Sequence, residues 1–132
     1  MEITMSSTQT EELLLNWGAR IGAAAYSDGV KASQLENILA ILDVIEAKEA
    51  LLITALFAYR QARRLGTGNT MARMIQQAML DLYEKNLTKK EAREVLGIAK
   101  WVYEALQGSG IRVQRDQLSK LTLHELLKQF TR

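Results

Sequence analysis

The sequence predicts an all-α, single-domain helical bundle of about five to six helices. Three observations support this fold class. Four segments have a Ser or Thr followed three residues later by Glu, the pattern of a capping box at a helix start. Apolar residues recur at three- and four-residue spacing, and none of the 132 residues is a proline. A chain of this length has a prior of one domain with its own core.

The first helix is predicted over about Gln9 to Tyr26, after residues 1–7, which have no periodic pattern and are expected to be frayed. Gly18 and Gly22 lie one turn apart on this helix, beside a run of alanines. A glycine inside a helix costs about 1 kcal/mol relative to alanine, so we expect another helix to pack closely on this face. Gly29 can adopt the left-handed conformation that ends a helix.

Two helices are predicted between Ser33 and Leu65. The first keeps helical spacing of its apolar residues to about Ala47, and the second begins near the apolar run at Leu51. The polar group at 46–49 contains no helix breaker, so one long rod over residues 34–65 is the alternative. We favour two helices because such a rod exceeds the usual length of globular helices.

Three helices are predicted after the turn at residues 66–68. Asn69 or Thr70 caps a helix over about Met71 to Lys85, whose methionine stripe we interpret as core. Thr88 opens a helix that runs to about Gln107. Residues 111–132 are expected to form an extended arm and a short terminal helix with a capping box at its start. The inward face of the helix after Thr88 is predicted to consist of Ala92, Val95, Leu96, Ala99, Val102, Tyr103 and Leu106.

The composition excludes several kinds of functional site. Cysteine is absent and His124 is the single histidine. Disulfides, thiolate catalysis, cysteine metal sites and histidine clusters are therefore ruled out. The segment Gly66-Thr67-Gly68-Asn69-Thr70 lacks the Gly-Lys-Ser/Thr ending of a phosphate loop and follows a helix instead of a strand. No residue constellation requires catalysis, so we predict a protein that is not an enzyme and that uses no cofactor or metal.

The chain is predicted to be cytoplasmic, with no membrane partner. Its longest apolar run, Leu51 to Tyr59, is far shorter than the ~20 residues that span a bilayer, and no signal segment opens it. The net charge of +2 conceals an asymmetry: residues 1–58 carry three Lys/Arg against eight Asp/Glu, whereas residues 59–132 carry fourteen against seven. The positive part suits a polyanion, and the negative part suits a basic protein or a neighbouring copy of the chain.

The strongest candidate site lies in the segment 59–73, which contains four arginines and no acidic residue. Arg60, Arg63 and Arg64 fall on one side of a helix, because positions three and four apart are neighbours. Arg73 follows early in the next helix and can fold back toward them. Guanidinium groups grip phosphates through two hydrogen bonds, so this cluster predicts binding to a nucleic-acid backbone. The alternative is a solvated helix end whose cations complement the helix dipole.

Further basic and aromatic residues extend the candidate nucleic-acid site. Lys89, Lys90 and Arg93 lie at the start of the helix after Thr88, and Tyr59 precedes the arginines. An exposed tyrosine can stack on a base. Trp101 could do the same if exposed, but it is expected to anchor the core. The pattern suits binding along the backbone better than sequence-specific reading of bases.

Three stretches of the chain form a recognisable set: Ser33-Gln34-Leu35 at a helix start, Ala58-Tyr59-Arg60-Gln61-Ala62-Arg63-Arg64 at the end of an apolar helix, and Ala99-Lys100-Trp101-Val102-Tyr103-Glu104-Ala105-Leu106 in a late helix. In these stretches the chain resembles the small-subunit family of multisubunit CRISPR effector complexes of type III or archaeal type I. The resemblance covers about residues 32–107. The late helix lacks the aromatic-rich ending expected of type III members, and the arm after it is additional.

The resemblance implies a non-catalytic subunit. In that family a tyrosine and a following arginine close the middle helix, and basic side chains there face the guide–target nucleic acid. The resemblance implies that position for Tyr59, Arg60, Arg63 and Arg64. The implied partners are nucleic-acid backbone, other effector-complex subunits and further copies of the chain. The rival hypothesis is a helical adaptor that binds only proteins. A nucleoid or viral coat protein is a third possibility, but such proteins usually carry a larger positive charge.

Overall fold

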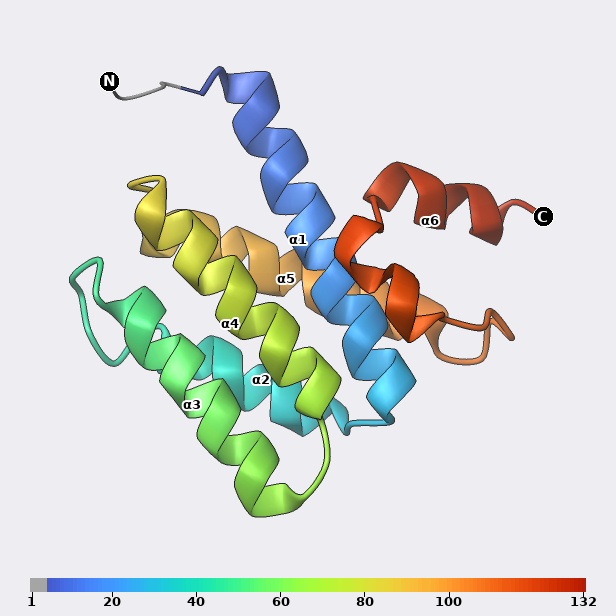
Figure 1. Cartoon of the computed structure of the whole chain (residues 1–132), viewed down its shortest axis with the longest axis horizontal. Coiled ribbons are helices and arrows are strands. Elements are labelled where there is room, and N and C mark those ends of the chain that lie inside the picture. Colours follow the sequence, from blue (N-terminus) through green and yellow to red (C-terminus); the bar gives the residue numbers. More distant parts are fainter. Residues whose placement is uncertain (1–4) are drawn as a thin grey trace.

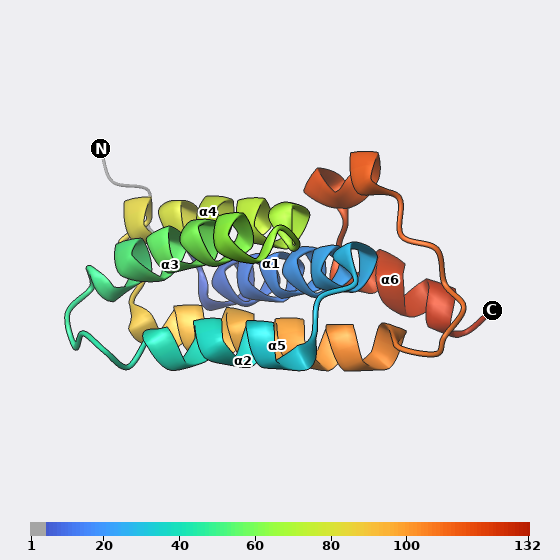
Figure 2. The same ribbon diagram turned by 90° about the horizontal axis from the view of Figure 1, so that it is seen from below.

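Helix α1 lies at the centre of the fold, between two pairs of helices (Figure 2). One pair consists of α3 and α4 and the other of α2 and α5. The computed structural model describes residues 5–132, and within them it confirms the predicted all-α helical bundle. The bounds of these helices are α1 (Ser7–Asp28), α2 (Ala32–Ile41), α3 (Ala50–Leu65), α4 (Asn69–Glu84) and α5 (Lys89–Leu106).

The remainder of the chain lies beside α1 on the side away from α3 (Figure 1). It comprises a 3-10 helix, η1 (Arg115–Lys120), and the terminal helix α6 (Leu123–Phe130). Residues 111–114 belong to no helix or strand, and the backbone of Gln114 is extended. The 3-10 helix that follows was not predicted. Arg20 of α1 fixes this region, since its Nε donates to the carbonyl of Leu121 at 2.9 Å.

The glycine face of α1 packs against α5, as the sequence predicted. A Cβ atom on Gly18 would lie 2.4 Å from the Ile98 side chain. One on Gly22 would lie 2.6 Å from the carbonyl oxygen of Ala99. Both distances are shorter than a van der Waals contact, so only glycine permits the observed approach of the two backbones. This contact is the reason α1 tolerates two interior glycines.

The start of α1 differs from the prediction. Ser6 is the N-cap residue, and its side chain accepts from the backbone N–H of Gln9 at 3.1 Å. The Gln9 side chain accepts in return from the N–H of Ser6, so a Ser-Gln capping box replaces the expected Thr-Glu box. Fraying was predicted for residues 1–7. This prediction is wrong for Ser6 and Ser7, and residues 1–4 lie outside the described part of the chain.

The prediction of two helices between Ser33 and Leu65 is confirmed, although α2 is shorter than expected. It ends at Ile41 instead of Ala47, and a loop at 42–49 leads to α3. Lys89 holds this loop from α5, since its Nζ lies 3.4 Å from the carbonyl oxygen of Ile45. The Ile45 carbonyl thus accepts a hydrogen bond from a side chain of α5 and requires no helical N–H partner.

The three helices α4, α5 and α6 differ in how their N-termini are capped. Gly68 occupies the N-cap position of α4 at φ 87°, so the expected cap by Asn69 or Thr70 is not formed. At α5 the predicted capping box is present, with the Glu91 carboxylate accepting from the N–H of Thr88 at 2.8 Å. Thr122 accepts from the N–H of Glu125 at 3.1 Å and caps α6.

The core contains the predicted stripes of α4 and α5. Met71, Met74 and Met79 are buried, which confirms the interpretation of the methionines as core. All seven residues predicted for the inward face of α5 are buried. The prediction that Trp101 anchors this core is wrong, because its side chain is 74% exposed. Within the described residues, no helix is both long and apolar enough to cross a membrane.

Candidate nucleic-acid interface

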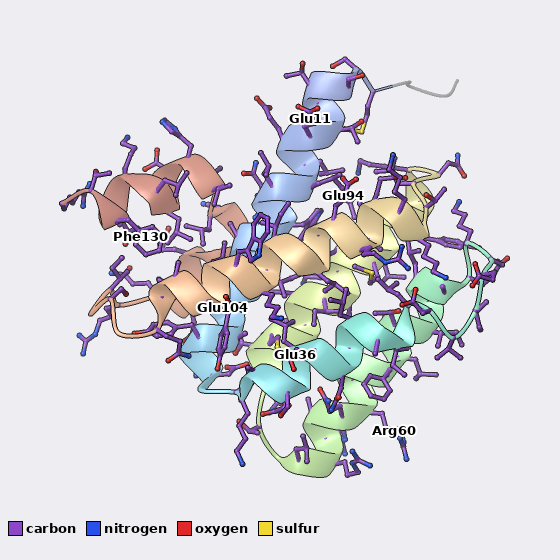
Figure 3. The ribbon with its side chains drawn as sticks, turned by 180° about the vertical axis from the view of Figure 1, so that it is seen from behind. Glu11, Glu36, Arg60, Glu94, Glu104 and Phe130 are labelled. Carbon is purple, nitrogen blue, oxygen red and sulfur yellow. The ribbon has the colours of Figure 1, made fainter. Side chains whose placement is uncertain are left out.

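The C-terminal half of α3 turns its arginines outward. Gln61 is buried, and its Nε2 donates to the backbone carbonyl of Gln34 in α2 at 3.4 Å. With the buried Ala58 and Ala62, this bond fixes the inward side of the helix. Arg60 and Arg63 therefore lie on the exposed side, and Figure 3 shows Arg60 pointing away from the bundle.

Arg73 lies at the same end of the α3–α4 hairpin. The two helices are antiparallel neighbours joined by a short turn, so the end of α3 and the start of α4 are adjacent (Figure 1). Arg73 is exposed, as are the arginines of α3. The structure thus brings to one end of the hairpin the four residues that we call the arginine surface: Arg60, Arg63, Arg64 and Arg73.

The arginine surface is not neutralised within the described chain. No carboxylate of residues 5–132 lies within ion-pair distance of its four guanidinium groups. Among the described residues these arginines make one ring contact, a cation–π interaction in which the Arg63 guanidinium lies 5.8 Å from the centre of the half-exposed Tyr59 ring. Four cations and an aromatic ring are therefore available to a ligand.

The second group of candidates has a different environment. Lys89 Nζ lies 3.3 Å from the Glu46 carboxylate and 3.6 Å from the Asp43 carboxylate, and Arg93 forms an ion pair with Asp43. These two cations hold the α2–α3 loop. Lys90 is exposed and makes no ion pair with any described residue.

The two groups of basic candidates lie at opposite ends of the bundle. Figure 2 shows that α5 begins where α3 begins, whereas the arginine surface is where α3 ends. A single continuous site containing both groups is therefore not formed. Arg93 and Asp43 are 50 positions apart, so the sequence alone gave no sign that these charges meet.

Sequence reasoning missed the outer face of α5. Trp101 projects from it, and Gly97, one turn earlier, has open space where a Cβ would lie. The spacing contained the signal, because position 101 falls outside the apolar stripe formed by Ala99, Val102 and Tyr103. The prediction that Trp101 is buried relied on its residue type and not on this spacing.

Arg20 is a further basic residue whose role was not predicted. Its guanidinium lies 5.0 Å from the centre of the Trp17 ring, and burial lowers the pKa of Arg20 while the Asp81 carboxylate partly opposes this shift. The ordinary pKa of arginine is so high that the lowered pKa of Arg20 still leaves it charged at neutral pH. Its contacts are internal and place it outside the arginine surface.

The search for metal-ligand clusters and the comparisons with known proteins gave no match. The described residues contain no group of three or more His, Asp or Glu side chains that could hold a metal ion. No protein-family model, curated protein or solved structure matches the chain.

Proposed function

We propose that this protein is a non-catalytic nucleic-acid-binding subunit whose arginine surface grips the phosphate backbone. The observation that carries the proposal is the absence, in residues 5–132, of any carboxylate paired with these four arginines. Guanidinium groups without a carboxylate partner are available to form bidentate hydrogen bonds with phosphate oxygens. Tyr59, beside Arg63, adds a ring on which a base can stack.

We further propose that the subunit acts in the cytoplasm within a CRISPR RNA-guided effector complex. The support is the resemblance in sequence described above, in which Tyr59 and Arg60 close the middle helix. Guide RNA or target strand is then the bound nucleic acid. The exposed Trp101 on α5 gives such a subunit a second surface for a neighbouring protein, since tryptophan is enriched at the centres of protein interfaces.

The salt dependence of binding tests the proposal. Each phosphate contact on a single strand contributes about −0.7 to the slope of log affinity against log salt. If three contacts come from Arg60, Arg63 and Arg64, replacing all three with Ala flattens the slope by about 2 and weakens binding to every sequence alike. The measurement is a titration of single-stranded oligonucleotides at several salt concentrations, with the purified effector complex used where the isolated subunit binds too weakly.

Matched variants separate this effect from a general loss of charge. Arg93→Ala removes an exposed guanidinium that already pairs with Asp43, so it is expected to leave the slope nearly unchanged. A triple Arg→Lys variant keeps the charge but loses the bidentate fork, and its affinity should fall between those of the parent and the triple-Ala variant. An unchanged affinity and slope in a folded triple-Ala variant would contradict backbone binding by this surface.

A protein-only adaptor is the second candidate function, and the outer face of α5 favours it. Trp101 is 74% exposed and Gly97 leaves room beside it, which suits an inserted side chain of a partner. The titrations distinguish the two functions. An adaptor gives no nucleic-acid binding with or without the arginines, whereas loss of a protein partner in a Trp101→Ala variant is expected of both functions.

A further inference from the structure

A pocket of about 340 Å³ lies between the extended arm, η1 and α6. Its apolar lining comes from Leu118 and Leu126, which are 2% and 1% exposed, together with Val113 and Leu121. This volume falls at the lower end of the range for small-molecule sites, about 300–1,000 Å³. The pocket is separate from the arginine surface, because different elements form it.

The rim of the pocket carries positive charge. Arg112 and Arg132 both line it, and no Asp or Glu does. Neither guanidinium is within ion-pair distance of an Asp or Glu side chain among the described residues. By contrast Arg115, on the neighbouring 3-10 helix, is engaged by Asp28 at 3.4 Å. Two guanidiniums over an apolar floor favour a ligand with an anionic group and a flat or apolar body.

Three glutamines give the pocket hydrogen-bonding capacity. Gln114, Gln117 and Gln129 line it, and none of their side-chain amides bonds to another described residue. Each amide offers both a donor and an acceptor. Such paired donors and acceptors match the edge of a nucleobase, which presents the same two kinds of group side by side.

We propose that this pocket binds a mononucleotide unit. The phosphate lies between Arg112 and Arg132, the base rests on the partly exposed Val113 and Leu121, and the glutamine amides bond to the base edge. Two kinds of ligand present such a unit: a free nucleotide, and one nucleotide of a bound strand. The site does not depend on the arginine surface, so either can fail without the other.

Calorimetric titration of the full chain with adenosine and uridine 5′-monophosphates tests the proposal. Saturable binding is expected with both, and the matching nucleosides and inorganic phosphate alone should bind at least tenfold more weakly. Arg112→Ala and Arg132→Ala should each weaken the mononucleotides about tenfold or more, as expected for loss of a charge-assisted hydrogen bond. Lys120→Ala is the matched control, since this exposed lysine belongs to η1 but does not line the pocket.

Competition identifies the source of the nucleotide. In the Arg60, Arg63 and Arg64 triple-Ala variant, mononucleotide binding should persist. A single-stranded oligonucleotide that displaces the mononucleotide from this variant assigns the pocket to a strand, and one that does not assigns it to a free nucleotide. The proposal is overturned if no mononucleotide binds with a Kd below about 1 mM, if nucleosides bind equally well, or if folded Arg112→Ala binds like the parent.

Discussion

The carboxylate of Asp28 accepts a hydrogen bond from the backbone N–H of Met71 at 2.8 Å, so the last residue of α1 caps the first turn of α4. The N-cap position itself is Gly68, which has no side chain to do this. The other carboxylate oxygen of Asp28 lies 3.4 Å from the Arg115 guanidinium. One side chain, 5% exposed, therefore joins α1, α4 and the 3-10 helix.

Replacing Asp28 with Ala is expected to destabilise the protein by about 2–3 kcal/mol, because a charge-assisted hydrogen bond is lost and a partly buried N–H is left unpaired. Asp28→Asn should cost less, since the amide oxygen still accepts from Met71. Urea unfolding followed by circular dichroism measures both. Glu36→Ala is the control: Glu36 pairs with Lys100 at 3.4 Å, but both are well exposed, so little stability should be lost. Equal midpoints for Asp28→Ala and Glu36→Ala would contradict the capping role.

The two glycines Gly22 and Gly97 should respond in opposite directions to alanine. A Cβ on Gly22 meets the Ala99 carbonyl at 2.6 Å, so Gly22→Ala must push α1 from α5 and cost about 1–3 kcal/mol. Gly97 meets nothing within 4 Å, so Gly97→Ala should stabilise the helix by up to about 1 kcal/mol. Thermal melts decide the matter, and a Gly22→Ala variant as stable as the parent would mean that the two helices do not approach this closely.

Lys89 is expected to control the mobility of the α2–α3 loop. Its side chain is 14% exposed and reaches Asp43, Glu46 and the carbonyl of Ile45. Lys89→Met should therefore speed amide hydrogen exchange in residues 43–48 without changing exchange in the core helices. Lys90→Met removes the same charge from the next position, where no ion pair forms within the described chain, and should leave the loop protected. Identical exchange in the two variants would refute the assignment.

Self-association of the protein should depend on salt. Residues 1–58 and 59–132 carry opposite net charges, which favours charge-assisted stacking of copies. Such contacts weaken as salt screens the exposed charges, over a Debye length of about 8 Å at physiological ionic strength. Sedimentation velocity at low and high salt measures the effect. A monomer at every salt concentration, with and without nucleic acid, would exclude stacking.

The helices and their inward faces could be predicted because both follow from local periodicity. The seven buried residues of α5 repeat at three- and four-residue spacing, and the capping box of Thr88 and Glu91 lies within one turn. The cap of α4 could not be predicted, since Asp28 and Met71 are 43 positions apart. The same limit applies to Arg93 and Asp43.

The candidate site shows the same division between local and distant effects. That Arg60 and Arg63 share the outer side of a helix follows from their spacing. That no carboxylate of residues 5–132 pairs with them, whereas two pair with Lys89, depends on where a distant loop folds. Trp101 was misplaced for a different reason: its residue type suggested burial while its helical position indicated exposure.

The two tryptophans of the chain lie in contrasting surroundings. Trp17 is half-buried, with its Nε1 donating to the Asp81 carboxylate at 2.9 Å, whereas Trp101 stands in solvent. Indole fluorescence shifts to longer wavelength in water, so Trp101 supplies the red edge of the emission. A molecule that covers the Trp101 ring would move this edge toward the blue. In a Trp17→Phe variant the emission comes from Trp101 alone. Trp101 therefore acts as an intrinsic optical probe of docking on the outer face of α5, since Tyr103, the other aromatic residue of this helix, is buried.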